Sequence, residues 1–142
     1  MCAAANKVQA EFWNGEVGRR WLARESEMEA VNRAVTDFLL TEATDFGPAR
    51  ILEIGCGSGG LTLSLAKRLP RAKVTGADIS DIFLERARAR GAQQPNLEFL
   101  LTDVQTASLP GPFDFAVSAF GMMFFDDPQA ALANIRRSMA HG

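Results

Sequence analysis

The stretch Arg50–Gly60, R-I-L-E-I-G-C-G-S-G-G, decides the fold of this 142-residue chain. Its first part, Ile51–Ile54, is a short and mainly apolar run that predicts a buried strand. Four glycines then predict a tight turn, and a helical apolar pattern starts directly after it with Leu61, Leu65 and Leu69. A strand, a glycine turn and a helix in this order bring backbone N–H groups and a helix N-terminus to a ligand.

The same alternation continues along the chain. Strands are predicted over 73–78, 97–101 and 113–118, and helices over 80–90 and 128–139. Ser80 and Asp127-Pro128 carry N-terminal helix signals, and Gly91 is typical of the position just after a helix. This order predicts an α/β fold with a mainly parallel sheet of four strands, flanked by helices and joined by right-handed crossovers.

The segment before the first strand is expected to form a separate unit. Residues 1–47 are predicted to be an N-terminal helical cap, and residues 48–142 the ligand-binding domain, with Gly47-Pro48 at the boundary. Within the cap, a helix is predicted from about Glu25 to Leu40. Its i, i+3, i+4 spacing predicts one apolar stripe, made of Met28, Val31, Val35, Phe38 and Leu39.

Both tryptophans of the chain, Trp13 and Trp21, lie in this cap, in the segment F-W-N-G-E-V-G-R-R-W. One interpretation is a helical cover whose aromatic side chains pack on the core. The other is a lid whose aromatic and arginine side chains close over a bound ligand. Tryptophan suits both, because it buries a large ring and carries an N–H that needs a polar partner.

The composition is that of a globular protein, with 47% hydrophobic residues, 23% charged residues and a net charge of −2. This balance gives no reason to expect a nucleic-acid or membrane partner, and no run of about 18 apolar residues predicts a membrane span. The arginines at 86, 88 and 90 are interpreted as a solvated helix face. Cys2 and Cys56 fit neither a disulfide framework nor a metal site, so we expect no metal and a reducing, cytoplasmic location.

Three acidic residues follow or end successive predicted strands: Glu53, Asp78 and Asp103. In an open parallel sheet the carboxyl ends of the strands share one edge, where ligands bind. Asp78 lies 19 residues after Gly59, close to the separation of about 20 expected for an acid that binds ribose hydroxyls. A single acid at such a place would be interpreted as a loop cap, but three in register favour a ligand site.

The turn G-C-G-S-G-G fits two glycine patterns, G-x-G-x-G and the dinucleotide pattern G-x-G-x-x-G. A dinucleotide needs two mononucleotide-binding halves, and the chain provides scarcely more than one. Asp103 adds a polar contact on the nucleoside side. The turn is therefore predicted to hold a nucleoside with a short polar tail, and a nucleotide-dependent oxidoreductase is the alternative.

Four segments resemble successive motifs of the class I S-adenosylmethionine-dependent methyltransferases: E-I-G-C-G-S-G-G, V-T-G-A-D-I-S, F-L-L-T-D-V and F-D-F-A-V-S-A-F. The resemblance extends to W-N-G-E-V-G-R-R-W and F-G-M-M-F-F-D-D-P, and it is closest to the small-molecule branch similar to ubiquinone and menaquinone methyltransferases. It implies a Rossmann-like fold, S-adenosyl-L-methionine as cofactor and a small-molecule methyl acceptor.

The resemblance also implies roles for individual residues. Asp78 would bind the ribose hydroxyls, Ile79 would pack on the adenine, and Asp103 beside Val104 would accept a hydrogen bond from the adenine amino group. The methionine part of the cofactor would lie against the glycine turn and the end of the fourth strand, at Glu53, Gly55, Cys56, Gly57, Gly59, Ser118 and Phe120. Trp13 and Trp21 would contribute a cover.

Transfer of a methyl group from a sulfonium needs mainly alignment and exclusion of water. No general base can be named: His141 is expected to have a structural or tail role, and helix capping accounts for Asp127. The run Met122–Phe125 has two interpretations, the lining of an acceptor pocket and core packing, and core packing is preferred.

In the resembled family the sheet continues beyond a fourth strand. We therefore expect the sequence to be a fragment, with a truncated product or strands supplied by a partner as alternatives, and little or no methyl transfer by the chain alone. The fourth strand would then be an unpaired apolar edge that allows self-association. A non-catalytic cofactor-binding module is the alternative function from outside the enzymes.

Overall fold

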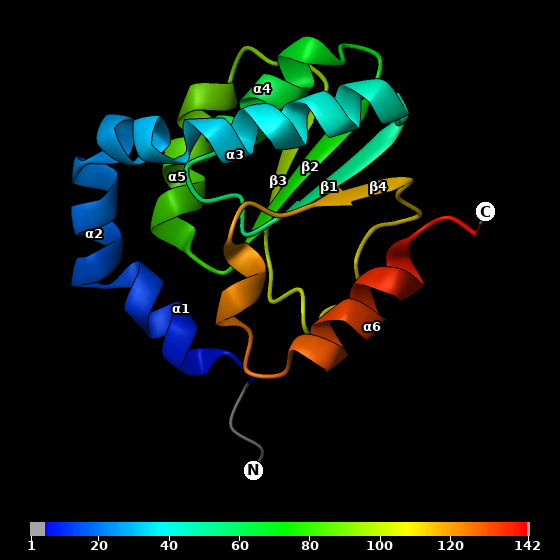
Figure 1. Ribbon diagram of the computed structural model, residues 1–142. Coiled ribbons are helices and arrows are strands. Elements are labelled where there is room, and N and C mark those ends of the chain that lie inside the picture. Colours follow the sequence, from blue (N-terminus) through cyan, green and yellow to red (C-terminus); the bar gives the residue numbers. More distant parts are fainter. Residues whose placement is uncertain (1–4, 142) are drawn as a thin grey trace.

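A four-stranded parallel sheet lies at the centre of the molecule, in the computed structural model of residues 5–141 (Figure 1). Its strands are β1 (Arg50–Ile54), β2 (Lys73–Asp78), β3 (Leu97–Leu101) and β4 (Phe115–Val117), in the spatial order β3-β2-β1-β4. Every neighbouring pair is parallel, which confirms the predicted α/β class and sheet. Cys2 and Gly142 lie outside the described residues.

Helices precede the sheet and alternate with its strands. Their bounds are α1 Lys7–Asn14, α2 Glu16–Ala23, α3 Glu25–Phe46, α4 Gly60–Arg68, α5 Asp81–Gly91, the 3₁₀ helix η1 Gly121–Phe124 and α6 Pro128–Ser138. One core joins the end of α3 and the buried face of α4 to Ile51 and Val74. A second core on the other face joins Leu52 and Phe113 to Ile135 of α6. The sheet is thus covered on both faces, as its apolar strands predicted.

The predicted helix starts at Ser80 and Asp127 are confirmed, but the predicted end of α5 is wrong. The Ser80 hydroxyl accepts the Phe83 N–H, and the Asp127 carboxylate accepts the Ala130 N–H with Pro128 in the first turn. Gly91, by contrast, is the last residue of α5 rather than a left-handed residue after it. A Cβ on Gly91 would lie 2.9 Å from a Leu97 methyl, so the need here is close approach between α5 and β3.

The apolar pattern of α3 was misread. α3 continues to Phe46, and its buried contacts come from Leu39, Leu40 and Ala43 near its end, whereas Val31 and Phe38 are exposed. The reason is geometric: only the second half of α3 lies over the sheet, and its first half extends beyond the sheet towards α2 (Figure 1). In α6, Leu132 is similarly exposed, and the buried amide of Asn134 donates to the Val104 and Ala107 carbonyls.

The predicted solvated arginine face is also only partly right. Arg86 and Arg90 of α5 form ion pairs with Glu25 at the start of α3, and Arg90 pairs with Glu29 as well. Arg90 further donates to the carbonyl of Ser58 in the glycine turn. These contacts join the first half of α3 to the sheet domain.

The predicted fourth strand, 113–118, was expected to have a wholly unpaired outer edge, but the structure shows a pairing at its first residue, before β4 begins. Phe113 forms a parallel bridge with Met139: the Phe113 N–H donates to the Ser138 carbonyl at 2.8 Å, and its carbonyl accepts from the Ala140 N–H. The chain after α6 therefore lies beside the segment that leads into β4. Among residues 5–141, no helix combines the length and apolarity needed to cross a bilayer.

Candidate functional site

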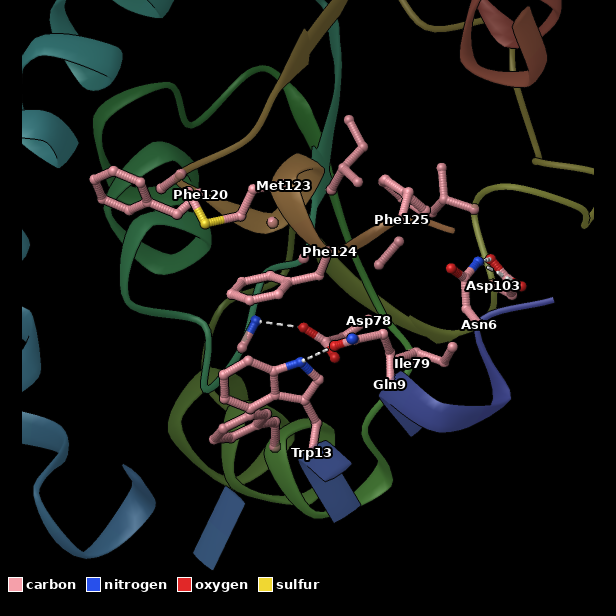
Figure 2. Close-up of a pocket in the computed structure, with 18 of the residues that line it drawn as sticks. Asn6, Gln9, Trp13, Asp78, Ile79, Asp103, Phe120, Met123, Phe124 and Phe125 are labelled. Atoms are coloured by element: carbon pink, nitrogen blue, oxygen red, sulfur yellow. Dashed lines mark hydrogen bonds between the residues drawn. The ribbon is translucent and has the colours of Figure 1, made fainter. Parts of the chain in front are cut away.

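A cavity of about 370 Å³ lies where the carboxyl ends of β1, β2 and β3 meet (Figure 2). The strand register creates this edge, because Ile54 is opposite Ala77 and Asp78 is opposite Leu101. The residues that follow the three strands form one wall, and the remainder comes mainly from α1, α2 and η1, with single residues from α3 and α5. The site is thus at the place where the sequence predicted ligand binding.

The glycine turn forms the floor of this cavity. Gly55 and Gly57 both have positive φ, at 68° and 55°. A Cβ on Gly55 would lie 2.8 Å from the Cα of Gly121, so the turn and the segment after β4 meet backbone to backbone. A Cβ on Gly57 would meet no atom within 4 Å. The backbone of Gly57 therefore faces open space, as a turn that receives a ligand must.

Asp78 closes the turn from the end of β2. Its two oxygens accept the Gly57 N–H at 2.8 Å and the Ser80 N–H at 2.9 Å. Burial raises the pKa of Asp78 above its ordinary value, and the N–H donors from Ser80 and Gly57 partly oppose that rise. Each carboxylate oxygen can accept more than one hydrogen bond, so Asp78 retains capacity for ligand hydroxyls.

Asp103 lies at the opposite end of the cavity, with a partner that the sequence did not suggest. The Asn6 amide donates to both Asp103 carboxylate oxygens, at 2.9 and 3.0 Å (Figure 2). The Gln105 N–H donates to the same carboxylate at 2.9 Å. Ile79 and Val104 line the cavity beside the two acids.

Three other predicted site residues lie behind the turn. Glu53 is 2% exposed and Cys56 is 6% exposed, and neither lines the main cavity. Both border a second, more polar cavity of about 410 Å³ beside α3 and α4. Gly59 is buried as well, and a Cβ there would lie 3.1 Å from Ala87 and from Phe99. These residues are thus placed to support the turn from behind.

The electrostatics behind the turn are unusual. Thr62 donates a hydrogen bond of 2.6 Å to the Glu53 carboxyl. Burial is the largest cause that raises the pKa of Glu53 to about 8, and the nearby Asp78 charge adds to the effect. Burial likewise raises the pKa of the Cys56 thiol well above its ordinary value. At neutral pH the thiol is therefore protonated and unreactive.

The segment after β4 forms an apolar part of the cavity wall. The Ser118 hydroxyl donates to the Ile54 carbonyl at 2.8 Å, which ties the end of β4 to that of β1. Ser118 itself does not line the cavity, whereas Phe120, Met123 and Phe124 do and are also exposed. The preferred interpretation of the run Met122–Phe125 as core packing is therefore wrong for Met123 and Phe124. Met122 and Phe125 alone, among its described residues, pack against the core on the α6 side.

The two tryptophans both line the cavity. Trp13 is the centre of an aromatic cluster in which its ring centroid lies 5.2 Å from Phe124 and 5.8 Å from Trp21. The Trp13 indole N–H donates to the Gln9 side-chain oxygen at 3.1 Å. Because an indole N–H can only donate, the Gln9 carbonyl must face Trp13, and the Gln9 NH₂ group is left to face elsewhere. The aromatic side chains of the cap thus pack on one another at the cavity, and their role as a lid over a ligand stays a prediction.

Several cavity residues were missed by sequence reasoning. They include Asn6, Gln9, Asn32 and Phe83, whereas Phe124 had been considered as part of an acceptor-pocket lining. Polar residues in the predicted cap gave no local signal. Within the part of the chain that the structure describes, the cavity wall contains two carboxylates and no Lys, Arg or His side chain.

A family model described as "Methyltransferase domain" matches residues 51–142. The chain belongs to the methyltransferase domain family. The resemblance drawn from the sequence motifs is thereby confirmed. Residues 51–142 of this methyltransferase domain hold the sheet apart from Arg50, the glycine turn and both cavity acids.

Curated relatives share the domain but are longer. A demethylmenaquinone methyltransferase of Thermus thermophilus is 37% identical over 113 residues, which cover 78% of this chain and 49% of that protein. The methyltransferase domain described here thus spans about half the length of the curated relatives it matches.

Solved structures agree with the fold. Magnesium protoporphyrin IX methyltransferase from Synechocystis PCC 6803, with bound S-adenosylmethionine, superposes with a TM-score of 0.79 at 18% identity, covering 98% of this chain and 74% of that one. The N-methyltransferase NodS from Bradyrhizobium japonicum WM9, in complex with S-adenosylhomocysteine, gives 0.68 at 26% identity, covering 78% and 57%. The role of each cavity residue in this methyltransferase domain stays a prediction.

Proposed function

We propose that the chain binds S-adenosylmethionine in the cavity at the glycine turn, and that the protein transfers its methyl group to a small-molecule acceptor. The observation that carries this proposal is the pairing of Asp78 and Asp103 at neighbouring strand ends, above a turn whose Gly57 faces open space. Membership of the methyltransferase domain family supports it. So does S-adenosylhomocysteine in the solved relative NodS.

The residues fit the chemistry of this ligand. Asp78 has acceptor capacity for the ribose hydroxyls, and Asp103 for the adenine amino group. Ile79 and Val104 offer apolar faces for the base, and the two carboxylates suit a ligand that carries a positive sulfonium. The cavity volume of about 370 Å³ falls within the ordinary range for small-ligand sites.

The remaining predicted residues take supporting roles in this proposal. Gly55 keeps the turn against the segment after β4, and Phe120 lines the cavity near the methionine end. Glu53, Cys56, Gly59 and Ser118 act indirectly, through the shape of the turn. Trp13 and Trp21 cover the ligand, so that residues 1–47 serve as a cap for the domain formed by 48–142.

The bound cofactor supplies an already activated methyl group. The chain's own residues are then required to align the acceptor and to exclude water. The aromatic cluster around Trp13 and Phe124 excludes water on the cap side. We assign no general base, because His141 is exposed and remote in sequence from the cavity residues, and because Asp78 and Asp103 are committed to the cofactor.

The acceptor is proposed to be a small molecule without a strong negative charge. The described cavity wall offers no cationic side chain to pair with a carboxylate or phosphate, whereas Phe120, Met123 and Phe124 offer exposed apolar surface. The acceptor itself and the atom that is methylated are not assigned. Self-association through the β4 edge and the cytoplasmic location remain predictions from the sequence.

Calorimetric titration with S-adenosylhomocysteine and with NAD tests the cofactor. We expect the former to bind, and Asp78→Ala to weaken its binding by roughly 1.5–3 kcal/mol, the scale of hydrogen bonds to a charged group. Asp81→Ala is the matched control, because Asp81 is an exposed acid in the first turn of α5 and lies outside the cavity. Preferential binding of NAD would instead favour the oxidoreductase alternative, and unchanged affinity in folded Asp78→Ala would reject the ribose contact.

Turnover is a separate question from binding. Incubation with labelled S-adenosylmethionine and a panel of neutral, apolar acceptors is expected to give methylated product. Tight cofactor binding with no product from any acceptor class would favour a non-catalytic binding module.

A further inference from the structure

Asn6 is a buried polar residue that the proposed chemistry does not yet use. It is 2% exposed, although it lies near the start of the described chain and directly before α1. Its backbone has positive φ, at 57°, which Asn tolerates better than most residues. A buried amide must find partners for its two N–H donors and its carbonyl oxygen, and the choice of partners indicates what it does.

The ordinary role of Asn at this position is absent. Asn before a helix usually accepts an N–H from the first helical turn, but the Asn6 side chain makes no such bond to α1. Its NH₂ group instead donates to both oxygens of Asp103 and, at 3.1 Å, to the Gln105 side-chain oxygen. Asn6 therefore serves the residues after β3 rather than its own helix.

The same residue is also joined to the segment after η1. The Asn6 N–H donates to the Asp126 carboxylate at 2.8 Å, and the Asp126 N–H donates to the Asn6 side-chain oxygen at 2.8 Å. Gln105 continues the network, since its side-chain oxygen also accepts the Asp127 N–H at 3.0 Å. Three cavity walls that are distant in sequence are thus connected through one amide.

This geometry fixes the Asp103 carboxylate. A donor that contacts both oxygens, together with the Gln105 N–H on Oδ1, restrains rotation of the carboxylate plane. Within residues 5–141, Oδ2 accepts a single hydrogen bond, so it keeps acceptor capacity on the side of the cavity that Asp103 lines. A carboxylate held in one orientation favours a base with an amino group, which can donate to it, over a base with a carbonyl at the same position. The carbonyl base would leave two hydrogen-bond acceptors facing each other.

We propose that Asn6 is a positioning residue that holds Asp103 for base recognition and thereby sets selectivity for an adenine over a 6-oxo purine. The inference rests on the proposed function, because it assumes that the nucleoside end of the cofactor lies at Asp103. Asn6 itself has its donors occupied and need not touch the ligand.

The test compares two probes, S-adenosylhomocysteine and S-inosylhomocysteine, whose bases differ in amino against carbonyl at one position. Asn6→Ala is expected to weaken binding of the adenine probe about tenfold while it changes binding of the inosine probe much less, so the preference for adenine falls by at least about threefold. Dissociation constants are measured by calorimetry on the full chain.

Asn14→Ala is the matched control. Asn14 also joins the cap to the sheet domain, through its side-chain oxygen to the Asp81 N–H at 2.8 Å, but it does not contact Asp103. It should weaken both probes to a similar degree and leave the preference unchanged. Asn6→Ser is measured alongside Asn6→Ala as a smaller change, and both variants are checked for folding by cooperative thermal unfolding. If Asn6→Ala does not fold, the two dissociation constants of Asn6→Ser provide the test.

Each outcome decides between the ideas. Equal weakening of both probes in the Asn6 variants would mean that Asn6 only stabilises the cap, and the inference would be wrong. A wild-type chain that binds both probes equally would also overturn the inference, while cofactor binding would stand. A wild-type chain that binds neither probe would overturn the proposed function and the inference together.

Discussion

Glu53→Gln tests the view that Glu53 is held protonated behind the glycine turn. Glu53 is 2% exposed, its one hydrogen-bond partner among the described side chains is Thr62, and the charge of Asp78 further raises its pKa. Its pKa is raised to about 8 from an ordinary value of 4.5. Gln keeps the size and the hydrogen-bonding capacity of the protonated acid but cannot ionise.

The sign of the pH effect follows from proton linkage. Between pH 4.5 and 8 the folded state holds a proton on Glu53 that the unfolded state has lost, so the folded state is favoured at the lower end and stability falls as pH rises. At pH 6, two units below the folded pKa, this group contributes about 2–3 kcal/mol. By pH 9 almost none of that contribution is left.

The assay is urea unfolding of wild type and Glu53→Gln at pH 6, 7, 8 and 9, in the same buffer series. The free energy of unfolding of the wild type should fall relative to the variant by about 2–3 kcal/mol across the range. Parallel pH profiles for the two proteins would refute a buried, protonated Glu53.

Two further predictions concern the turn and its cover. Gly55→Ala should lower the free energy of unfolding in urea by more than about 2 kcal/mol, because the new Cβ adds a clash against Gly121 to the strain of a positive φ. Gly47→Ala is the control and should lose only about 1 kcal/mol, because Gly47 has the same φ but open space around it. Equal losses would argue against the close backbone contact at Gly55. Trp13→Phe keeps an aromatic ring in the cluster but removes the indole N–H that orients the Gln9 side chain, so affinity for S-adenosylhomocysteine should fall about threefold or more. Trp21→Phe should change the affinity less, because the Trp21 indole N–H makes no hydrogen bond within residues 5–141. A larger loss of affinity in Trp21→Phe than in Trp13→Phe would show that Gln9 needs no orienting partner.

The features that sequence reasoning predicted well are local ones. The run Ile51–Ile54 and the glycines after it gave the strand, the turn and the following helix, and Ser80 and Asp127 gave two helix starts. Propensity, periodicity and capping act over a few residues, so they can be read without knowledge of distant contacts. The acids at 78 and 103 reached the same cavity because parallel strands must end at one edge.

The errors arise where the partner surface was unknown. The apolar spacing of α3 correctly predicted a helix, but only the fold decides that Leu39 and Ala43 lie over the sheet while Val31 extends beyond it. The run Met122–Phe125 likewise has a composition suited to a core or to a cavity wall. Burial depends on what lies opposite a side chain, which periodicity does not specify.

The sequence by itself therefore determined the parallel sheet, the glycine turn and the two acids above it, because each follows from local backbone preferences and from the common direction of the strands. Only the tertiary structure decided how that site is completed. Asn6 meets Asp103 and Asp126 across separations of 97 and 120 residues, and Glu53 turns away from the cavity it had been assigned to. Such contacts form when whole elements pack, and hydrogen-bond partners chosen at that stage leave no periodic trace in the chain.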